Sequence, residues 1–150
     1  LIPNCFVTGH AAGVAGAASR RAEDFWQSLG ARTAVMDAET HDRVMAGTSH
    51  LPHLVAAMLV DTVLRRDDVR PYCGTGFRCT TRVAGGSDDI WHDIIKSNRD
   101  AVLAELQTFE DVVTRVKAMI ESDDFDAMRA FLANTMQKRR SLDVPEPHHD

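Results

Sequence analysis

The sequence has few cysteines, no excess of basic charge and no long apolar run, and each shortage excludes a class of protein. Its three cysteines, Cys5, Cys73 and Cys79, form no C-x-x-C pair, which excludes a disulfide scaffold and favours a reducing cytoplasm. The 17 Lys and Arg against 22 Asp and Glu give a net charge of −5, which argues against nucleic acid as a partner. No apolar run approaches the roughly 20 residues that a membrane-spanning helix needs.

What remains is the composition of an ordinary globular domain, with 44% hydrophobic and 26% charged residues among 150. A chain of this length buries about two-thirds of its unfolded surface, enough for one core but not for two ordinary domains. The chain starts at Leu1, and no basic segment precedes its first apolar residues, so we expect no signal peptide. We interpret it as a fragment or a processed chain that begins inside a larger fold.

The N-terminal segment has the pattern of a short α/β unit. Residues 5–8 predict a strand, and residues 31–36 predict a second one. Between them, Ser19 is expected to cap a helix over residues 22–29, which Gly30 would end.

The rest of the sequence is helical in pattern. Asp37 is expected to cap a long helix over residues 38–66. Pro52 interrupts this helix, and an interior proline removes a hydrogen bond and clashes with the preceding turn at a cost of ~3 kcal/mol. We therefore expect a kink at residues 49–52. The run 54–60 is apolar nearly all round, which is typical of a helix buried on several sides.

The next stretch is broken by glycine and proline. Residues 67–76 predict a loop, and residues 77–83 predict a short helix or turn that ends at Ala84–Gly86. Ser87 is expected to cap a further helix, because two aspartates follow it where the helix dipole favours carboxylates.

The clearest periodicity lies near the C-terminus. Apolar residues recur there at intervals of 4, 3, 4, 3 and 4 along a helix of about two dozen residues: Val102, Leu106, Phe109, Val113, Val116 and Ile120. A turn at 122–124 precedes a second amphipathic helix over 125–136, which predicts an antiparallel hairpin. Either both apolar stripes face the chain's own core, or part of this seam is a homodimer interface.

Two groups of residues have the chemistry of a binding site. His50 and His53 lie three apart beside a proline kink and suit a metal or an anion, although a satisfied structural pair explains the spacing equally well. A zinc site needs a third ligand, and His41 lies nine residues earlier. Arg78 and Arg82, one helical turn apart, suit a bidentate grip on a carboxylate or a salt bridge to a nearby aspartate.

Two further motifs leave alternatives open. Trp91 suits the core or an interface as well as contact with a ligand. The stretch Thr8–Gly16 superficially resembles a dinucleotide-binding loop, but its spacing is not G-x-G-x-x-G and no alternating βαβ pattern follows.

Taken together, the motifs between residues 30 and 140 resemble the C-terminal half of prephenate dehydrogenase and its arogenate-using relatives. The resemblance rests on their order, spacing and helical context: His41-Asp42 with Ala46, Ser49–His53 with Ala56, Gly76–Arg78 with Thr81-Arg82, and Trp91 with Asp93, Ile94 and Asn98. It implies a mainly α fold, a helical dimerisation domain preceded by a short α/β remnant of a Rossmann domain. Residues 1–36 are then that remnant, 37–142 the dimerisation and substrate domain, and 143–150 a polar tail.

The resemblance also implies a chemistry. The family oxidises the ring hydroxyl of prephenate or arogenate, passes hydride to NAD or NADP and releases the ring carboxylate as CO₂, forming 4-hydroxyphenylpyruvate or tyrosine. His10 matches the start of the family's Gly-His-Pro-Ile-Ala-Gly motif, whose histidine acts as a general base. Arg82 matches the arginine that holds a substrate carboxylate. The implied substrate-binding residues are His50, His53, Arg82, Trp91, Arg78 and Thr81, with Trp91 reaching the substrate from the partner subunit.

The expected assembly is a cytoplasmic homodimer that binds prephenate or arogenate, with no nucleic-acid or membrane partner and no metal. The sequence departs from the family at three places. It has no G-x-G-x-x-G, so no cofactor-binding residue is assigned; Ala11–Gly13 replaces Pro-Ile-Ala-Gly; and Cys79 stands where the family commonly has Asp. We therefore expect that this chain alone does not turn over. The alternatives are a non-catalytic homodimerisation or regulatory module and a metal-binding helical protein using His41, His50 and His53.

Overall fold

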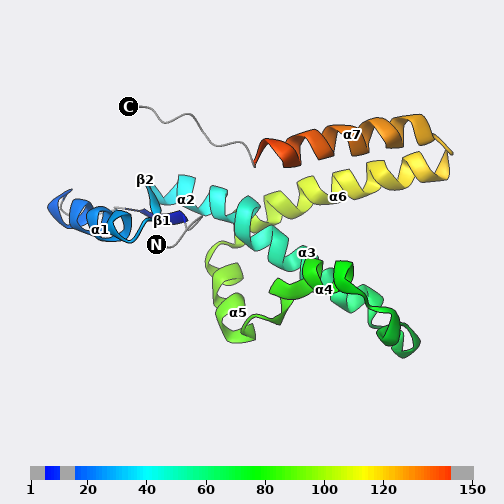
Figure 1. The fold of residues 1–150 in the computed structure, drawn as a ribbon, viewed down its shortest axis with the longest axis horizontal. Helices are drawn as coiled ribbons and strands as arrows, with labels where there is room; N and C mark the ends of the chain where they lie inside the picture. The colour runs from blue at the N-terminus through cyan, green and yellow to red at the C-terminus, as the bar shows by residue number, and fades with distance from the viewer. Residues whose placement is uncertain (1–5, 11–15, 143–150) are drawn as a thin grey trace. The chain divides into compact units, whose positions relative to one another are not determined.

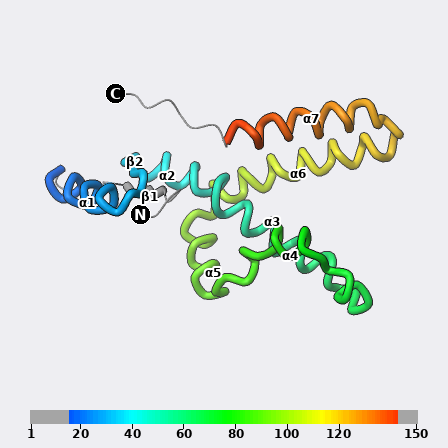
Figure 2. Tube along the Cα trace, viewed as in Figure 1, coloured from blue at the N-terminus to red at the C-terminus, as the bar shows by residue number. Residues whose placement is uncertain are grey.

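Helices dominate the computed structural model, which describes residues 6–10 and 16–142 (Figure 1, Figure 2). The chain forms two compact units, Leu1–Leu106 and Gln107–Asp150. The elements in chain order are β1 (Phe6–His10), α1 (Gly16–Ser28), β2 (Arg32–Met36), α2 (Ala38–Met45), the π-helical turn η1 (Ala46–His50), α3 (Leu51–Val63), the 3₁₀ helix η2 (Asp67–Tyr72), α4 (Thr75–Thr81), the 3₁₀ turn η3 (Arg82–Gly85), α5 (Asp88–Ser97), α6 (Arg99–Glu121) and α7 (Phe125–Ser141). The predicted mainly α fold with a short α/β segment is confirmed. The predicted domain boundaries after residues 36 and 142 stay predictions.

The α/β segment at the start of the first unit is a βαβ crossover, so the expectation that no βαβ pattern follows residues 8–16 is wrong for this one unit. Strands β1 and β2 pair in parallel, and α1 makes the long connection that parallel strands require. Helix α1 begins at Gly16, and Ser19 lies inside it with its hydroxyl donating to Glu23 Oε1 over 3.4 Å. The predicted cap at Ser19 is therefore wrong, because the alanines before it are strong helix formers and extend the helix. The predicted end is confirmed, since Gly30 has φ 85° and donates to the Gln27 carbonyl over 2.8 Å.

The long helix changes from α-helical to π-helical geometry directly before Pro52, where an interruption is expected. Asp37 caps α2 as expected, because its Oδ1 accepts from the Thr40 N–H and its Oδ2 from the Thr40 hydroxyl, both over 2.8 Å. After α2, the Leu51 N–H donates to the Ala46 carbonyl, which closes a π turn. Pro52 then falls in the first turn of α3, where its missing N–H leaves no bond unmade.

Helix α3 is less covered than its apolar sequence predicts. Ala56 is 2% exposed, but Met58 is 42% exposed and its neighbours in the run 54–60 are half-buried. The expectation of burial on several sides is wrong for the single chain. Helix α3 packs against η1, α4 and η3, and these elements leave part of its surface open.

Two predictions for residues 67–87 need correction. Residues 67–76 contain the 3₁₀ helix η2 rather than a plain loop, because the fixed φ of Pro71 is compatible with a tight helical turn. Helix α5 begins after Ser87 as predicted, but the Ser87 side chain makes no capping hydrogen bond; only its carbonyl accepts, from the Trp91 N–H over 3.1 Å.

The second unit is the predicted helical hairpin, made by the remainder of α6 and by α7 (Figure 1). The chain reverses at Asp123, whose φ is 55°, and Asp124 then caps α7 by accepting from the Ala127 N–H over 2.9 Å. The Arg115 guanidinium carbon lies 5.5 Å from the centre of the Phe131 ring, a cation–π contact between the two helices.

The apolar seam of α6 has two different environments. Val102 is buried at 3% exposure, whereas Val113 and Ile120 are 49% and 55% exposed. A groove of about 550 Å³ runs along this second part and is lined mainly by valines, with Phe109 and Ile120. The seam is therefore open to solvent within the second unit. No helix in the described part of the chain is long and apolar enough to cross a membrane.

Candidate functional site

Two histidines and a tryptophan from separate helices meet in the first unit. His50 ends η1, His53 lies in the first turn of α3, and Trp91 lies in the first turn of α5. The His53 imidazole stacks on the Trp91 indole of the same chain, with ring centroids 3.5 Å apart and planes 13° from parallel. The predicted contact of Trp91 with substrate in the partner subunit stays a prediction. The His50 ring stands nearly perpendicular to the same indole, at 86°, with centroids 6.2 Å apart. The two histidines are buried, at 8% and 7% exposure, and Trp91 is half-buried.

Gly86 allows this close stacking. A Cβ built at position 86 lies 2.6 Å from Trp91 Nε1 and 3.5 Å from His53 Cε1. The first distance is shorter than side-chain atoms tolerate, so any larger residue here displaces the indole. The glycine is required by close approach and not by a positive φ, because its backbone is ordinary extended chain at φ −67° and ψ 165°.

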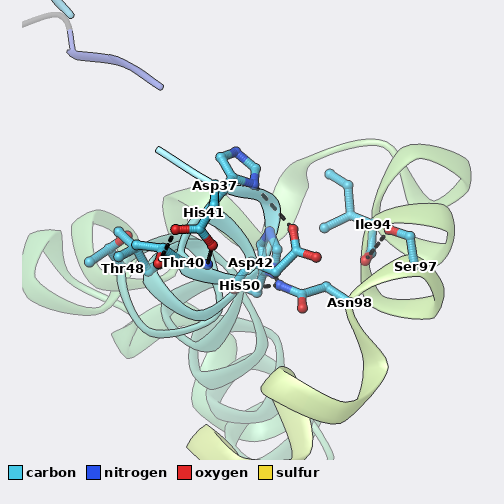
Figure 3. A network of polar contacts seen from close by, with 10 residues as sticks. Asp37, Thr40, His41, Asp42, Thr48, His50, Ile94, Ser97 and Asn98 are labelled. Atoms are coloured by element: carbon cyan, nitrogen blue, oxygen red, sulfur yellow. Dashed lines mark hydrogen bonds and ion pairs between the residues drawn. The ribbon is translucent and has the colours of Figure 1, made fainter. Parts of the chain in front are cut away.

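Asn98 connects this cluster to the first helix of the domain. It is 8% exposed and sits between α5 and α6. Its Nδ2 donates to the Asp42 carbonyl over 2.7 Å and lies 3.2 Å from His50 Nδ1 (Figure 3). Asn98 belongs to the family motif but is not among the predicted site residues. Nothing in its local sequence marks it, because both partners lie far away along the chain.

Burial sets the charge state of both histidines. Burial lowers the pKa of His50, the nearby Asp42 carboxylate partly offsets this, and His41 lowers the pKa further. Burial also lowers the pKa of His53, and the Val83 backbone carbonyl acts in the opposite direction. Both imidazoles are therefore neutral at neutral pH.

One atom of the cluster is unsatisfied. His53 Nδ1 is buried and has no hydrogen-bond partner among the residues that the structure describes. Such a buried polar atom costs roughly 1–3 kcal/mol. Cluster stability therefore depends on the His53–Trp91 stack rather than on hydrogen bonding by this nitrogen.

Arg78 and Thr81 line a different hollow, a groove of about 420 Å³ between α3, η2 and α4 whose lining does not include His50 or His53. The Arg78 Nε donates to the Cys73 carbonyl over 3.0 Å. The Thr81 hydroxyl donates to the Phe77 carbonyl over 2.7 Å, and Thr81 is 9% exposed. The structure thus brings these two predicted residues together in one groove, and their predicted convergence with the histidines stays a prediction.

For the remaining predicted site residues, Arg82 and His10, the structure gives the position in the chain but does not test the predicted role. Arg82 begins η3 directly after Thr81 and is exposed, and its convergence with His50 and His53 stays a prediction. His10 ends β1 opposite Met36 at the edge that adjoins α2, and the structure describes its backbone but not its side chain. Its catalytic role stays a prediction. Cys5, the altered motif 11–13 and the polar tail 143–150 lie outside the described residues.

The described residues do not form a metal-binding site. No group of three His, Cys, Asp or Glu side chains within 16–142 is arranged to hold a metal ion. The third predicted ligand, His41, instead places its Nδ1 3.1 Å from the Asp42 carboxylate. The residues also do not fit a nicotinamide dinucleotide, because the described sheet has two strands and a dinucleotide crevice forms where a wider parallel sheet reverses its strand order.

Comparisons by sequence and by structure both find prephenate, arogenate or cyclohexadienyl dehydrogenases. Residues 37–135 match the family described as prephenate dehydrogenase, dimerization domain. The chain is 34% identical over 124 residues to a cyclohexadienyl dehydrogenase of Zymomonas mobilis, covering 79% of this chain and 42% of that protein. It is 29% identical over 111 residues to a prephenate dehydrogenase of Bacillus subtilis, covering 71% of this chain and 30% of that protein.

Solved structures agree. A prephenate dehydrogenase from Aquifex aeolicus, in complex with hydroxyphenyl propionate and NAD+, superposes with a TM-score of 0.80 at 28% identity, over 91% of this chain and 49% of that one. An arogenate dehydrogenase from Synechocystis shares the fold, with a TM-score of 0.74 at 22% identity over 86% of this chain and 49% of that one. The chain thus spans less than half the length of these relatives. On this match, the chain belongs to the prephenate dehydrogenase family, and residues 37–135 form its dimerization domain.

Proposed function

We propose that this chain provides the dimerisation and substrate-binding part of a cytoplasmic prephenate or arogenate dehydrogenase in tyrosine biosynthesis. Such an enzyme oxidises the ring hydroxyl of its substrate with NAD or NADP and releases the ring carboxylate as CO₂. The observation that carries the proposal is the cluster of two buried histidines, His50 and His53, and the half-buried Trp91, assembled from three elements of the matched region.

The chemistry of the cluster suits a small ring compound that carries carboxylates. The Trp91 indole provides an apolar face, and neutral imidazoles offer N–H groups to carboxylate or hydroxyl oxygens. Arg82 is our candidate for the bidentate partner of a substrate carboxylate, which guanidinium geometry fits. His10, at the end of β1, is our candidate for the base that accepts the proton of the ring hydroxyl.

We also propose that the partner is a second copy of this chain. The second unit leaves large apolar side chains exposed on both helices, among them Val113 and Ile120 on α6 and Leu132 and Met136 on α7, at 46–57% exposure. Several large exposed apolar side chains beside an apolar groove on α6 favour an interaction site. A homodimer formed through this seam accounts for the exposure and suits a domain of a dimerization family.

The 150 residues do not turn over substrate by themselves under this proposal. Hydride transfer needs a bound nicotinamide cofactor, and the described residues do not fit one. Under this proposal the chain contributes substrate binding and dimerisation, and no described residue is assigned to the cofactor.

Calorimetric titration with prephenate and with 4-hydroxyphenylpyruvate tests substrate binding. We expect binding at millimolar concentration or below, weakened at least about tenfold in Arg82→Ala, since a hydrogen bond to a charged group contributes about 1.5–3 kcal/mol. Arg65→Ala is the matched control, because Arg65 is an exposed arginine paired with Asp61. Failure of both ligands to bind the unchanged protein at millimolar concentration overturns the proposal.

The second candidate function is a non-catalytic homodimerisation or regulatory module derived from the same family. It is favoured by Cys79, an exposed thiol at a position where the family commonly has Asp. This function predicts a dimer in light scattering whose properties do not change in Arg82→Ala or His53→Gln. Ligand binding that depends on Arg82 would favour the first proposal, in which the chain is part of an enzyme.

A further inference from the structure

The Asn98 side chain contacts two groups that lie eight residues apart in the chain, the Asp42 carbonyl and the His50 imidazole. Its Nδ2 lies 2.7 Å from the Asp42 carbonyl oxygen in α2 and 3.2 Å from His50 Nδ1 at the end of η1 (Figure 3). With 8% exposure for both Asn98 and His50, water has little access to this junction. Because water has little access, the position of the hydrogen on each of these groups is determined by its neighbours in the junction.

The orientation of the Asn98 amide follows from its contact with Asp42. A backbone carbonyl oxygen can only accept a hydrogen bond. Turning the amide over would place Asn98 Oδ1 against the Asp42 carbonyl at hydrogen-bond distance, with two acceptors facing each other. The atom beside the carbonyl is therefore the nitrogen, which carries two hydrogens.

This orientation decides which nitrogen of His50 carries the proton. One hydrogen of the Asn98 amide goes to the Asp42 carbonyl, and the other faces His50 Nδ1 at 3.2 Å. An amide nitrogen does not accept hydrogen bonds, so His50 Nδ1 has to be the acceptor. The proton of the neutral ring is then on Nε2. If the ring were doubly protonated, its Nδ1–H would face the amide N–H of Asn98, and two donors cannot form a hydrogen bond.

We propose that Asn98 is a positioning residue that holds His50 as the neutral Nε2–H tautomer, so that His50 offers a hydrogen-bond donor to an oxygen of the ligand and does not act as its base. This inference rests on the proposed function, because it assigns a role to His50 within the proposed substrate site. The ligand group that fits is a carboxylate, hydroxyl or carbonyl oxygen. Proton removal from the substrate then falls to another residue, for which His10 is the candidate.

The perpendicular contact with Trp91 supports a fixed ring. The two ring planes meet at 86° with centroids 6.2 Å apart, and the indole is held in turn by its stack on His53. His50 is thus confined on one side by an aromatic ring and at Nδ1 by an amide. An imidazole held in this way presents Nε2 of His50 to every ligand, and Asn98 keeps it in that position.

Nitrogen NMR of the histidine rings in the ligand-free protein tests the tautomer. We expect His50 Nδ1 at the shift of an unprotonated nitrogen and Nε2 at the shift of a protonated one, with the signals assigned by their loss in His50→Gln. A protonated Nδ1 in the unchanged protein overturns the proposal. This measurement uses no ligand, so its failure is distinct from a failure of the proposed function.

Two substitutions at position 98 separate positioning from mere packing. Asn98→Asp replaces the amide donor with a carboxylate acceptor, so we expect His50 Nδ1 to become protonated and its signal to move to the shift of a protonated nitrogen. Asn98→Gln keeps the amide and should keep the Nε2–H signal. An unchanged tautomer in a folded Asn98→Asp protein contradicts the proposal; if that variant does not fold, the spectrum of the unchanged protein still decides.

Discussion

The imidazole of His53 lies flat on the indole of Trp91, with ring centroids 3.5 Å apart. The two residues come from α3 and α5, so the stack joins the start of the kinked helix to the helix that follows η3. Stacked aromatic pairs contribute about 0.5–1.5 kcal/mol beyond the area they bury. This contact therefore positions both side chains of the candidate site and helps to stabilise the first unit.

Gly86→Ala should break this stack. The new Cβ lies 2.6 Å from Trp91 Nε1, so the indole has to shift, and overpacking of this kind typically costs about 1–3 kcal/mol. We expect a lower urea midpoint and a changed tryptophan fluorescence. Gly85→Ala is the control, since a Cβ at position 85 meets nothing within 4 Å. Equal effects of the two substitutions would contradict this role of Gly86.

Stability should fall as the pH drops below about 6.5, the ordinary pKa of histidine. Burial lowers the pKa of both His50 and His53 in the folded chain, so the unfolded chain binds more protons in this range. The contribution of the two histidines is complete above the unfolded pKa and is lost as the pH falls toward the lowered folded values. Urea unfolding at a series of pH values between neutral and acid measures it.

The control for this pH dependence is an exposed histidine. His50→Gln and His53→Gln should each flatten the dependence, whereas His92→Gln should not, since the His92 side chain is 70% exposed and contacts Asp93. A pH profile that stays unchanged in both buried-histidine variants is incompatible with the neutral cluster.

Val113→Asp should dissociate the homodimer. Val113 is 49% exposed in the single chain, so the substitution costs little within the helix, but a dimer that covers the seam would bury the new carboxylate without a partner. Light scattering should report a monomer at concentrations where the unchanged chain is a dimer. Thr114→Asp, at an exposed position on a different face of α6, should leave the dimer intact. A monomeric unchanged chain at micromolar concentration refutes the interface.

Most of the fold predictions that were confirmed rest on residues close together in the sequence. The sequence alone was sufficient for the Asp37 cap, the end of α1 at Gly30 and the interruption of the α-helix before Pro52, because each depends on neighbouring residues. The cap predicted at Ser19 failed because helix propensity extended α1 back to Gly16. Propensity and capping compete within a few residues, and nothing in the pattern decides between them.

The contacts of the candidate site were less predictable, because they join residues far apart in the chain. The three-residue spacing of His50 and His53 put both on one helix, but it did not indicate that Trp91 would stack on the second of them. Asn98 gave no local signal at all, since its partners, Asp42 and His50, are brought to it only by the fold.

The most direct test of the account follows Trp91 while prephenate binds. Replacing Trp26, the other tryptophan of the chain, by Phe leaves Trp91 as the only indole reporter. Titration with prephenate should then change the fluorescence of Trp91 saturably at millimolar concentration or below, and the change should weaken in Arg82→Ala. A fluorescence signal that does not respond to prephenate at millimolar concentration, in a chain shown to be folded and dimeric, would contradict the claim that this domain binds the substrate.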